Sequence, residues 1–184
     1  MKRSDIIDKL KTIYFIENSF LKYLLNDEDV TDISYNGVDI YYVSNKEGRK
    51  KSDIVIEQQV ARDYIRQIAN LTEKQFSFTV PVLDISVGKY RINATHQSIG
   101  KVNDDGVVTF AIRIASKEIK IHKHSDFLTD DINELITVLL NSGASIVIGG
   151  VTSSGKTEFQ KYLLMNLKEN SRVIVIDNVL ELDQ

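Results

Sequence analysis

The stretch SIVIGGVTSSGKT, residues 145–157, joins an apolar run to a glycine-rich turn. The run Ile146–Ile148 predicts a buried strand, because short apolar runs bounded by turn residues are typical of strands in a sheet core. Residues 158–168 follow the turn and place Phe159, Leu163 and Leu167 on one stripe, which predicts a helix. The turn itself has the spacing Gly-x-x-x-x-Gly-Lys-Thr. Between a strand and a helix, this spacing predicts a phosphate-binding P-loop.

Each residue type in this motif has a physical reason to be there. Backbone N–H groups of the loop point inward at the positive end of the helix dipole, where they bind phosphate oxygens. Gly150 and Gly155 allow unusual dihedrals and a close approach of the backbone to those oxygens. Lys156 is expected to reach the β- and γ-phosphates, and the hydroxyl of Thr157 to bind Mg²⁺. The loop residues expected at the nucleotide are Gly150, Val151, Thr152, Ser153, Ser154, Gly155, Lys156, Thr157 and Glu158. The alternative is a glycine-rich turn without a ligand.

The composition is that of a globular protein. Of the 184 residues, 42% are hydrophobic and 27% are charged, which is enough for one domain or two small ones. A net charge of −3 argues against a general nucleic-acid clamp, so no direct nucleic-acid contact is predicted. The absence of cysteine excludes disulfides and cysteine metal sites. No apolar run reaches the length of a membrane span, and the N-terminus does not resemble a signal peptide, so a cytosolic protein is expected.

Residues 1–115 mix helical and strand patterns, which predicts an N-terminal α+β domain. Apolar residues at helical spacing predict helices starting near Ile6, over 20–25 and over 57–71. β-Branched and aromatic residues across Val30–Val43, with Asn36-Gly37 among them, predict a β-hairpin. Further strands are expected at 54–56, 76–87, 89–95 and 107–115, with Pro81 at a strand edge or break. Two histidines two residues apart, His122 and His124, and the lone His96 are interpreted as solvated or packed side chains rather than metal ligands.

The C-terminal part has a different organisation. Ile132, Leu135, Ile136, Leu139 and Leu140 predict an amphipathic helix, capped by Asp130 or Asp131 and ended by Gly143. Strands are expected at 144–149 and 172–177, on either side of the P-loop and its helix. Such a βαβ unit implies parallel strands. The polar stretch 116–125 is interpreted as a linker between a domain of residues 1–115 and a nucleotide-binding domain that begins at residue 126 and runs to 184.

Taken together, these motifs resemble the type II/IV secretion traffic ATPases, which power secretion, conjugation and pilus assembly. The resemblance extends from about Phe20 to Leu182. Besides the P-loop, it is carried by Val30–Gly37, Phe78–Pro81, Gly88–Ile92 and Phe110–Ile114.

The resemblance implies a PAS-like N-terminal α+β domain followed by an α/β, RecA-like domain, with ATP and Mg²⁺ bound between them in a ring that is usually a hexamer. It also implies that Arg91 and Arg113 contact the nucleotide phosphates; the alternative from the residues alone is a pair of solvent-facing arginines. Partners would be other copies of the chain and membrane-embedded secretion or pilus subunits. The protein would then act in the cytoplasm, at the inner face of the cell membrane.

The acidic box of that family departs from its usual form here. The segment reads Asp177-Asn178-Val-Leu-Glu181, so Asp177 takes the place of the family's catalytic glutamate and Glu181 is the second candidate base. Asn178 cannot act as a base, and Asp177 is one methylene shorter than glutamate, which matters for a water-activating group. Asp177 has two other interpretations: an aspartate that holds Mg²⁺ through water, or a cap of the next turn.

The sequence ends at Gln184, before the family's later aspartate and histidine motifs. We therefore expect an incomplete RecA-like domain with exposed apolar surface and unpaired strand edges, because parallel strands are normally buried on both faces. The leading functional hypothesis is the ATP-binding part of a transport ATPase, weak or inactive alone. The alternatives are a non-catalytic nucleotide-binding or assembly module, and an unrelated P-loop nucleotide kinase, for which no arginine-rich lid is visible.

Overall fold

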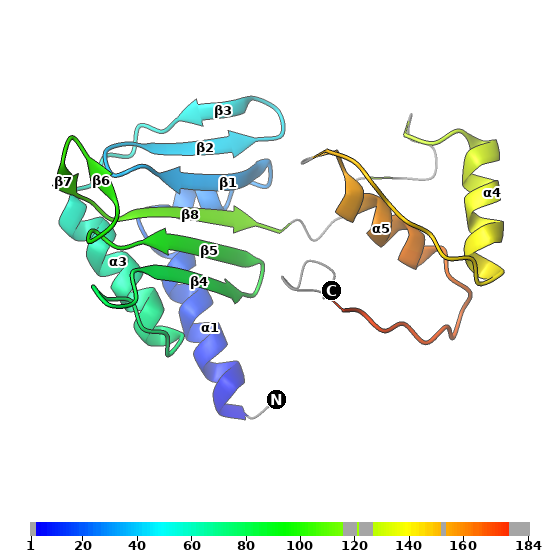
Figure 1. The fold of residues 1–184 in the computed structure, drawn as a ribbon, viewed down its shortest axis with the longest axis horizontal. Coiled ribbons are helices and arrows are strands. Elements are labelled where there is room, and N and C mark those ends of the chain that lie inside the picture. The colour runs from blue at the N-terminus through cyan, green and yellow to red at the C-terminus, as the bar shows by residue number, and fades with distance from the viewer. Residues whose placement is uncertain (1–2, 116–120, 122–126, 152–153, 177–184) are drawn as a thin grey trace. The chain divides into compact units, whose positions relative to one another are not determined.

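A computed structural model describes residues 3–115, 121, 127–151 and 154–176. The chain divides into two compact units, Met1–Ala115 and Ser116–Gln184, called unit 1 and unit 2 below. Figure 1 shows the helices and strands of the two units. The fold is mixed α/β with a mainly antiparallel sheet.

Unit 1 is built on a six-stranded sheet with the strand order β3-β2-β1-β8-β5-β4, and every neighbouring pair in it is antiparallel. Its strands are β1 (Val30–Tyr35), β2 (Ile40–Ser44), β3 (Gly48–Lys51), β4 (Val82–Val87), β5 (Tyr90–Thr95) and β8 (Thr109–Ile114). The short strands β6 (Lys101–Val102) and β7 (Asp105–Gly106) form a separate small hairpin. The helices are α1 (Arg3–Glu17), α2 (Lys22–Leu25) and α3 (Gln58–Leu71).

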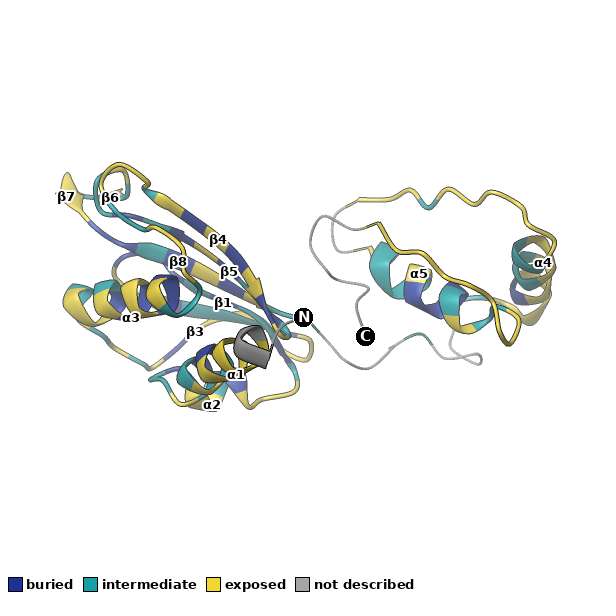
Figure 2. Cartoon of the chain, turned by 90° about the horizontal axis from the view of Figure 1, so that it is seen from below, coloured by how far each residue is buried: buried dark blue, intermediate teal, exposed yellow. Residues whose placement is uncertain are grey.

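The helices of unit 1 lie on one face of the sheet, which leaves two layers with a core between them (Figure 2). Alternation along the strands creates this arrangement, since every second residue of β4 is buried and the residues between are exposed. Aromatic rings connect the layers at the centre. The ring of Tyr64 on α3 lies 5.6 Å from Phe15, 5.0 Å from Phe20 and 5.9 Å from Phe110 on β8. Burial raises the pKa of Tyr64 to about 12.

The β1–β2 hairpin forms where the Asn36-Gly37 signal predicts it. The Asn36 side chain accepts hydrogen bonds from the backbone N–H groups of Val38 and Asp39 at 2.9 and 2.8 Å, and Gly37 has a φ of +101°. Gln58 at the start of α3 links this turn to the segment before β8 through hydrogen bonds. Its amide donates to the Tyr35 hydroxyl at 2.9 Å and to the Gly37 carbonyl, while its Oε1 accepts from the N–H of Val108 at 3.1 Å.

The third strand lies earlier than the sequence predicts. It is β3, whose residues include the basic run Arg49-Lys50-Lys51, and it forms an edge of the sheet, where charged side chains oppose unwanted pairing. The prediction of a strand at 54–56 is wrong, because the Ser52 hydroxyl accepts from the N–H of Ile54 at 3.2 Å and the chain leaves the sheet there. The predicted strand 76–87 is shortened to β4, which begins immediately after Pro81.

Unit 2 contains helices α4 (Asp130–Asn141) and α5 (Lys156–Met165). They are joined by a buried hydrogen bond of 2.7 Å from the Tyr162 hydroxyl to Asn133, and by Asn141, which donates to the Asn166 carbonyl at 3.2 Å. Gly143 ends α4 as predicted, with a φ of +84° and the backbone bonds of a Schellman motif. The predicted cap, Asp130 or Asp131, is wrong: Thr129 is the N-cap, without a side-chain cap bond, and both aspartates lie in the first turn.

The predicted parallel strands 144–149 and 172–177 are not observed in the described part of unit 2, where residues 144–149 and 172–176 have no strand pairing. A lone strand cannot satisfy its backbone groups or cover its side chains, so pairing decides whether an apolar run becomes a strand. Apolar side chains of both runs are exposed, with Val147 and Ile176 each 95% accessible. The apolar stripe of α4, which includes Leu135 and Val138, is exposed as well. This agrees with the expected exposure of apolar surface.

Candidate phosphate-binding site and arginine pair

The predicted P-loop lies directly before helix α5. The helix begins at Lys156, two residues earlier than the apolar stripe predicts, and its N-cap is Gly155. Gly155 has a φ of +85°, a left-handed conformation that glycine adopts without the strain of a side chain. The first residues of α5 are therefore Lys156, Thr157 and Glu158, at the positive end of the helix dipole. A loop with this ending fits a phosphate group.

The other motif glycine, Gly150, lies close to Ser154. A Cβ placed on Gly150 would lie 2.6 Å from the Ser154 hydroxyl oxygen and 3.7 Å from Cγ of Lys156. The neighbouring Gly149 has nothing within 4 Å of such a Cβ. A side chain at position 150 would therefore require the Ser154 hydroxyl to rotate away.

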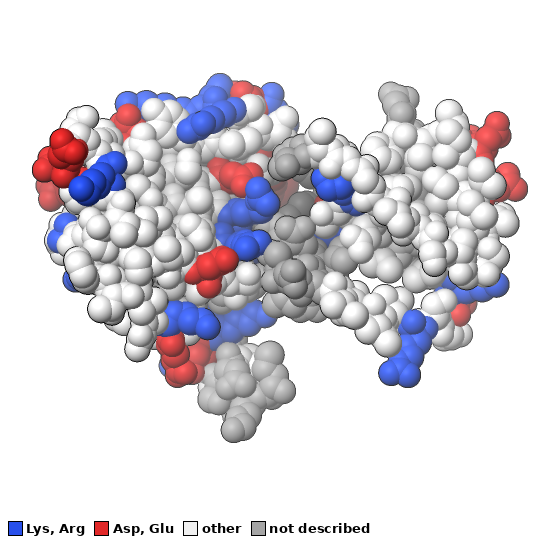
Figure 3. All heavy atoms as spheres, viewed as in Figure 1, with Lys and Arg blue, Asp and Glu red and all other residues white. Residues whose placement is uncertain are grey.

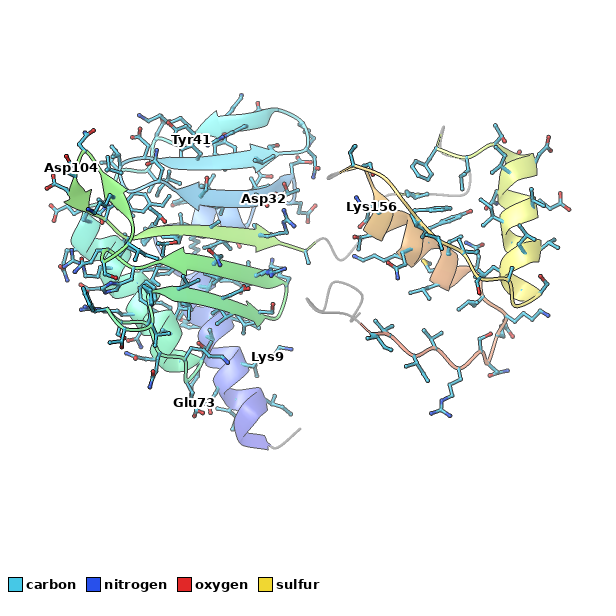
Figure 4. The ribbon with its side chains drawn as sticks, viewed as in Figure 1. Lys9, Asp32, Tyr41, Glu73, Asp104 and Lys156 are labelled. Atoms are coloured by element: carbon cyan, nitrogen blue, oxygen red, sulfur yellow. The ribbon has the colours of Figure 1, made fainter. Side chains whose placement is uncertain are left out.

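The Lys156 side chain turns back over the loop. Its ammonium donates a hydrogen bond of 2.6 Å to the carbonyl of Val151, five residues earlier, although the residue is not buried (Figure 4). The helix also holds an ion pair of 3.6 Å between Lys161 and Glu158. The loop thus places one ammonium group against its own backbone, near the position where phosphate oxygens are expected.

Several predicted site residues lie outside the described residues. They are Thr152 and Ser153 in the loop, and Asp177 and Glu181 in the acidic box; His122, His124 and Asn178 also lie outside. Their predicted roles stay predictions.

Arg91 and Arg113 are brought together by the sheet. They are direct cross-strand partners on β5 and β8, and their side chains lie on the face opposite the helices. Arg113 donates from Nε to Oδ1 of Asp32 on β1 at 3.1 Å. Arg91 donates to both carboxylate oxygens of Asp84 on β4, from Nε at 3.4 Å and from Nη2 at 3.2 Å. Both arginine side chains are thus partly exposed and each is paired with a carboxylate, and their predicted contact with nucleotide phosphates stays a prediction.

The acidic partners were not identified from the sequence. Asp32 and Arg113 are 81 residues apart, so their contact depends on the pairing of β1 with β8. The available signal was the alternation of β1, which places Asp32 on the open face beside Ser34. Figure 3 shows acidic and basic side chains gathered over β1, β8, β5 and β4. The same open face carries Tyr41 (Figure 4), and the guanidinium carbon of Arg49 lies 5.0 Å from the centre of its ring.

His96 is a buried side chain with hydrogen-bond partners, as one of its interpretations predicts. The N–H of Ser98 donates to its Nδ1 at 3.1 Å, which places the ring proton on Nε2. The ring meets Phe76 edge-on at 5.3 Å. Burial lowers the pKa of His96, and the charges of Arg66 and Arg62 on α3 lower it further. A protonated imidazole is therefore disfavoured in the folded protein.

The described residues contain no group of three or more histidine, cysteine, aspartate or glutamate side chains that could hold a metal ion. Among the same residues, no helix is both long and apolar enough to cross a membrane.

Comparison with known proteins leaves the family open, and no family model matches. The chain is 29% identical over 185 residues to an uncharacterized protein of Bacillus anthracis, covering 98% of this chain and 41% of that protein. It is 27% identical over 190 residues to an uncharacterized protein of Methanocaldococcus jannaschii, covering 96% of this chain and 26% of that protein. The chain therefore spans less than half the length of either relative.

One solved structure with similarity is the VirB11 ATPase from the Brucella suis type IV secretion system, in complex with sulphate. The match has a TM-score of 0.48 and 16% sequence identity, and it covers 93% of this chain and 57% of the other.

Proposed function

We propose that this chain binds ATP with Mg²⁺ through loop 150–158, as part of a transport ATPase of the secretion, conjugation or pilus-assembly type. The observation that carries the proposal is the Lys156 ammonium at the start of α5, which donates a hydrogen bond of 2.6 Å to the Val151 carbonyl. Gly150 supports it, because a Cβ at this position would lie 2.6 Å from the Ser154 hydroxyl oxygen. A phosphate oxygen is a stronger partner for this ammonium than a neutral carbonyl.

In this proposal the residues have separate tasks. The backbone N–H groups of the loop and Lys156 bind the β- and γ-phosphates, and the Thr157 hydroxyl holds Mg²⁺, which neutralises phosphate charge. Arg91 and Arg113 supply further cationic contacts to phosphate, for which the planar guanidinium is well suited. Asp177 and Glu181 are the candidate bases that orient or deprotonate water.

For the whole protein we propose that hydrolysis is coupled to macromolecular transport. The motor would be a self-associated ring, a hexamer by resemblance, with a PAS-like first domain and a RecA-like second domain. It would work at the cytoplasmic side of a membrane, on membrane-embedded secretion or pilus subunits. The exposed apolar runs 144–149 and 172–176 are compatible with a sheet that is completed by further strands.

A second candidate function is nucleotide binding without turnover, as an assembly module. Two residues favour it. Asn178 occupies a position where the family that the chain resembles has an aspartate, and Asp177 is one methylene shorter than the glutamate of that family. Binding and chemistry are separable in this motif, because the loop and Lys156 hold phosphate without providing the base.

The test is calorimetric titration of ATP, with and without Mg²⁺, into the full chain and into Lys156→Ala. Loss of one charge-assisted phosphate contact is expected to weaken binding at least roughly tenfold, which corresponds to about 1.5–3 kcal/mol. Lys168→Ala is the matched control, because Lys168 is exposed after the end of α5. Equal affinities for all three proteins would refute the P-loop assignment. A turnover assay at saturating Mg-ATP then separates the ATPase from the non-catalytic module.

A further inference from the structure

Four charged side chains lie on neighbouring strands of the open face of unit 1, in the order acidic, basic, basic, acidic. Asp32 on β1, Arg113 on β8 and Arg91 on β5 are direct cross-strand partners, and Asp84 on β4 lies diagonally from Arg91, whose direct partner on that strand is Ser86. The two cations are therefore neighbours in the middle, and each anion stands on the outer side. Arginines directly opposite each other in an antiparallel pair repel, so the outer carboxylates offset that repulsion.

The carboxylates bind the guanidinium edges that an oxyanion would use. The two carboxylate oxygens of Asp84 accept hydrogen bonds from Nε and Nη2 of Arg91. Arginine binds phosphate through the same bidentate, side-on geometry. Asp32 accepts a hydrogen bond from Nε of Arg113. Each arginine thus has an internal anion in contact with part of its donor set.

These ion pairs are weak enough to exchange. The side chains of Arg113 and Asp32 are 59% and 39% accessible, and those of Arg91 and Asp84 are 39% and 51% accessible. Exposed pairs of this kind add little to stability. A terminal phosphate carries more charge and more acceptor oxygens than a carboxylate, so it can displace one.

We propose that Asp32 and Asp84 set the phosphate affinity of the arginine pair by competing for it. Each carboxylate holds its arginine while no anion is bound, and a phosphate oxygen takes over the guanidinium edge when one binds. This inference rests on the proposed phosphate contacts of Arg91 and Arg113. Its consequence is that the acidic residues lower affinity, even though neither would be a phosphate ligand.

The experiment measures binding of Mg-ATP and of inorganic tripolyphosphate to the full chain, Asp32→Asn and Asp84→Asn by calorimetry. Release of an exposed ion pair is expected to tighten binding about two- to fivefold for each variant. Asp39→Asn is the matched control, because it removes one negative charge that is paired with Lys51 at 2.9 Å instead of an arginine. The control is expected to leave affinity unchanged.

A double-mutant cycle separates competition from a general charge effect. Asp84→Asn is repeated in an Arg91→Gln background, and Asp32→Asn in an Arg113→Gln background. Competition requires the gain in affinity to disappear when the arginine is gone. A gain that persists without the arginine, a loss of affinity in the aspartate variants, or no measurable anion binding by the parent chain would each overturn the inference.

The outcomes also distinguish this inference from the proposed function. If Lys156→Ala weakens binding while the double-mutant cycles show no coupling, the proposed P-loop function is supported and the proposed competition is rejected. If the cycle shows the coupling while Lys156→Ala binds normally, the P-loop assignment fails and unit 1 holds the phosphate site.

Discussion

Arg91 and Arg113 are direct cross-strand partners on β5 and β8, and each is tied to a carboxylate on the next strand outward. Two like charges at one register position cost stability. Because both side chains are partly exposed, this cost and the gain from the ion pairs are both small, so neither arginine is expected to contribute much to the stability of the sheet.

Replacing either arginine is therefore expected to separate stability from binding. Arg91→Gln and Arg113→Gln should shift the free energy of unfolding by no more than about 0.5 kcal/mol, while Mg-ATP affinity falls about tenfold. Urea melts and calorimetry measure the two quantities. Arg49→Gln, on the same face but over the Tyr41 ring, is the control and should keep its affinity. An equal loss in Arg49→Gln would show a diffuse charge effect instead of a site.

The P-loop offers adjacent glycines with different surroundings. Gly150→Ala places a methyl group 2.6 Å from the Ser154 hydroxyl oxygen, whereas Gly149→Ala meets nothing within 4 Å. We expect Gly150→Ala to weaken Mg-ATP binding about tenfold, because the methyl group displaces the Ser154 hydroxyl and hinders the close approach of phosphate to the backbone, and Gly149→Ala to have a small effect. Calorimetric titration measures both, with circular dichroism to confirm folding. Similar affinities for the two variants would contradict a role for the Gly150–Ser154 contact in binding.

Gln58 is expected to be a stability residue of unit 1. It fastens the β1–β2 turn and the start of β8 to α3, so Gln58→Ala leaves the N–H of Val108 without this partner. The expected loss is about 1–3 kcal/mol in the free energy of unfolding, measured by urea denaturation. Gln59→Ala is the neighbouring control, because Gln59 bonds only Asp63 in an exposed pair, and it should cost less than about 0.5 kcal/mol. A similar cost for both would refute the fastening role.

His96 predicts an acid-sensitive fold. Its pKa is lowered in the native state from an ordinary value of 6.5. Just below pH 6.5, His96 therefore binds a proton in the unfolded chain but not in the native protein. Stability should therefore fall as pH drops through 6.5 toward the native pKa of this residue. In His96→Asn, whose side-chain oxygen can still accept from Ser98, the fall over this window should be smaller. Urea midpoints at pH values on both sides of the window test this, and identical pH slopes would contradict it.

Local signals in the sequence determined much of the fold. The Asn36-Gly37 turn, the helix 57–71, the strands around Gly88 and the helix after the glycine-rich loop all follow from periodicity and turn chemistry between near neighbours in the chain. The P-loop was predicted for the same reason, since its spacing and its helix start lie within a few consecutive residues.

Tertiary structure decided what depends on distant partners. The runs 144–149 and 172–176 have the composition of strands but no strand pairing among the described residues, because a strand exists only through its neighbours. The edge position of β3 and the contact of Arg113 with Asp32 likewise required the strand order. Alternation indicated a charged position on each strand, and only the register across the sheet placed the two arginines side by side between two carboxylates.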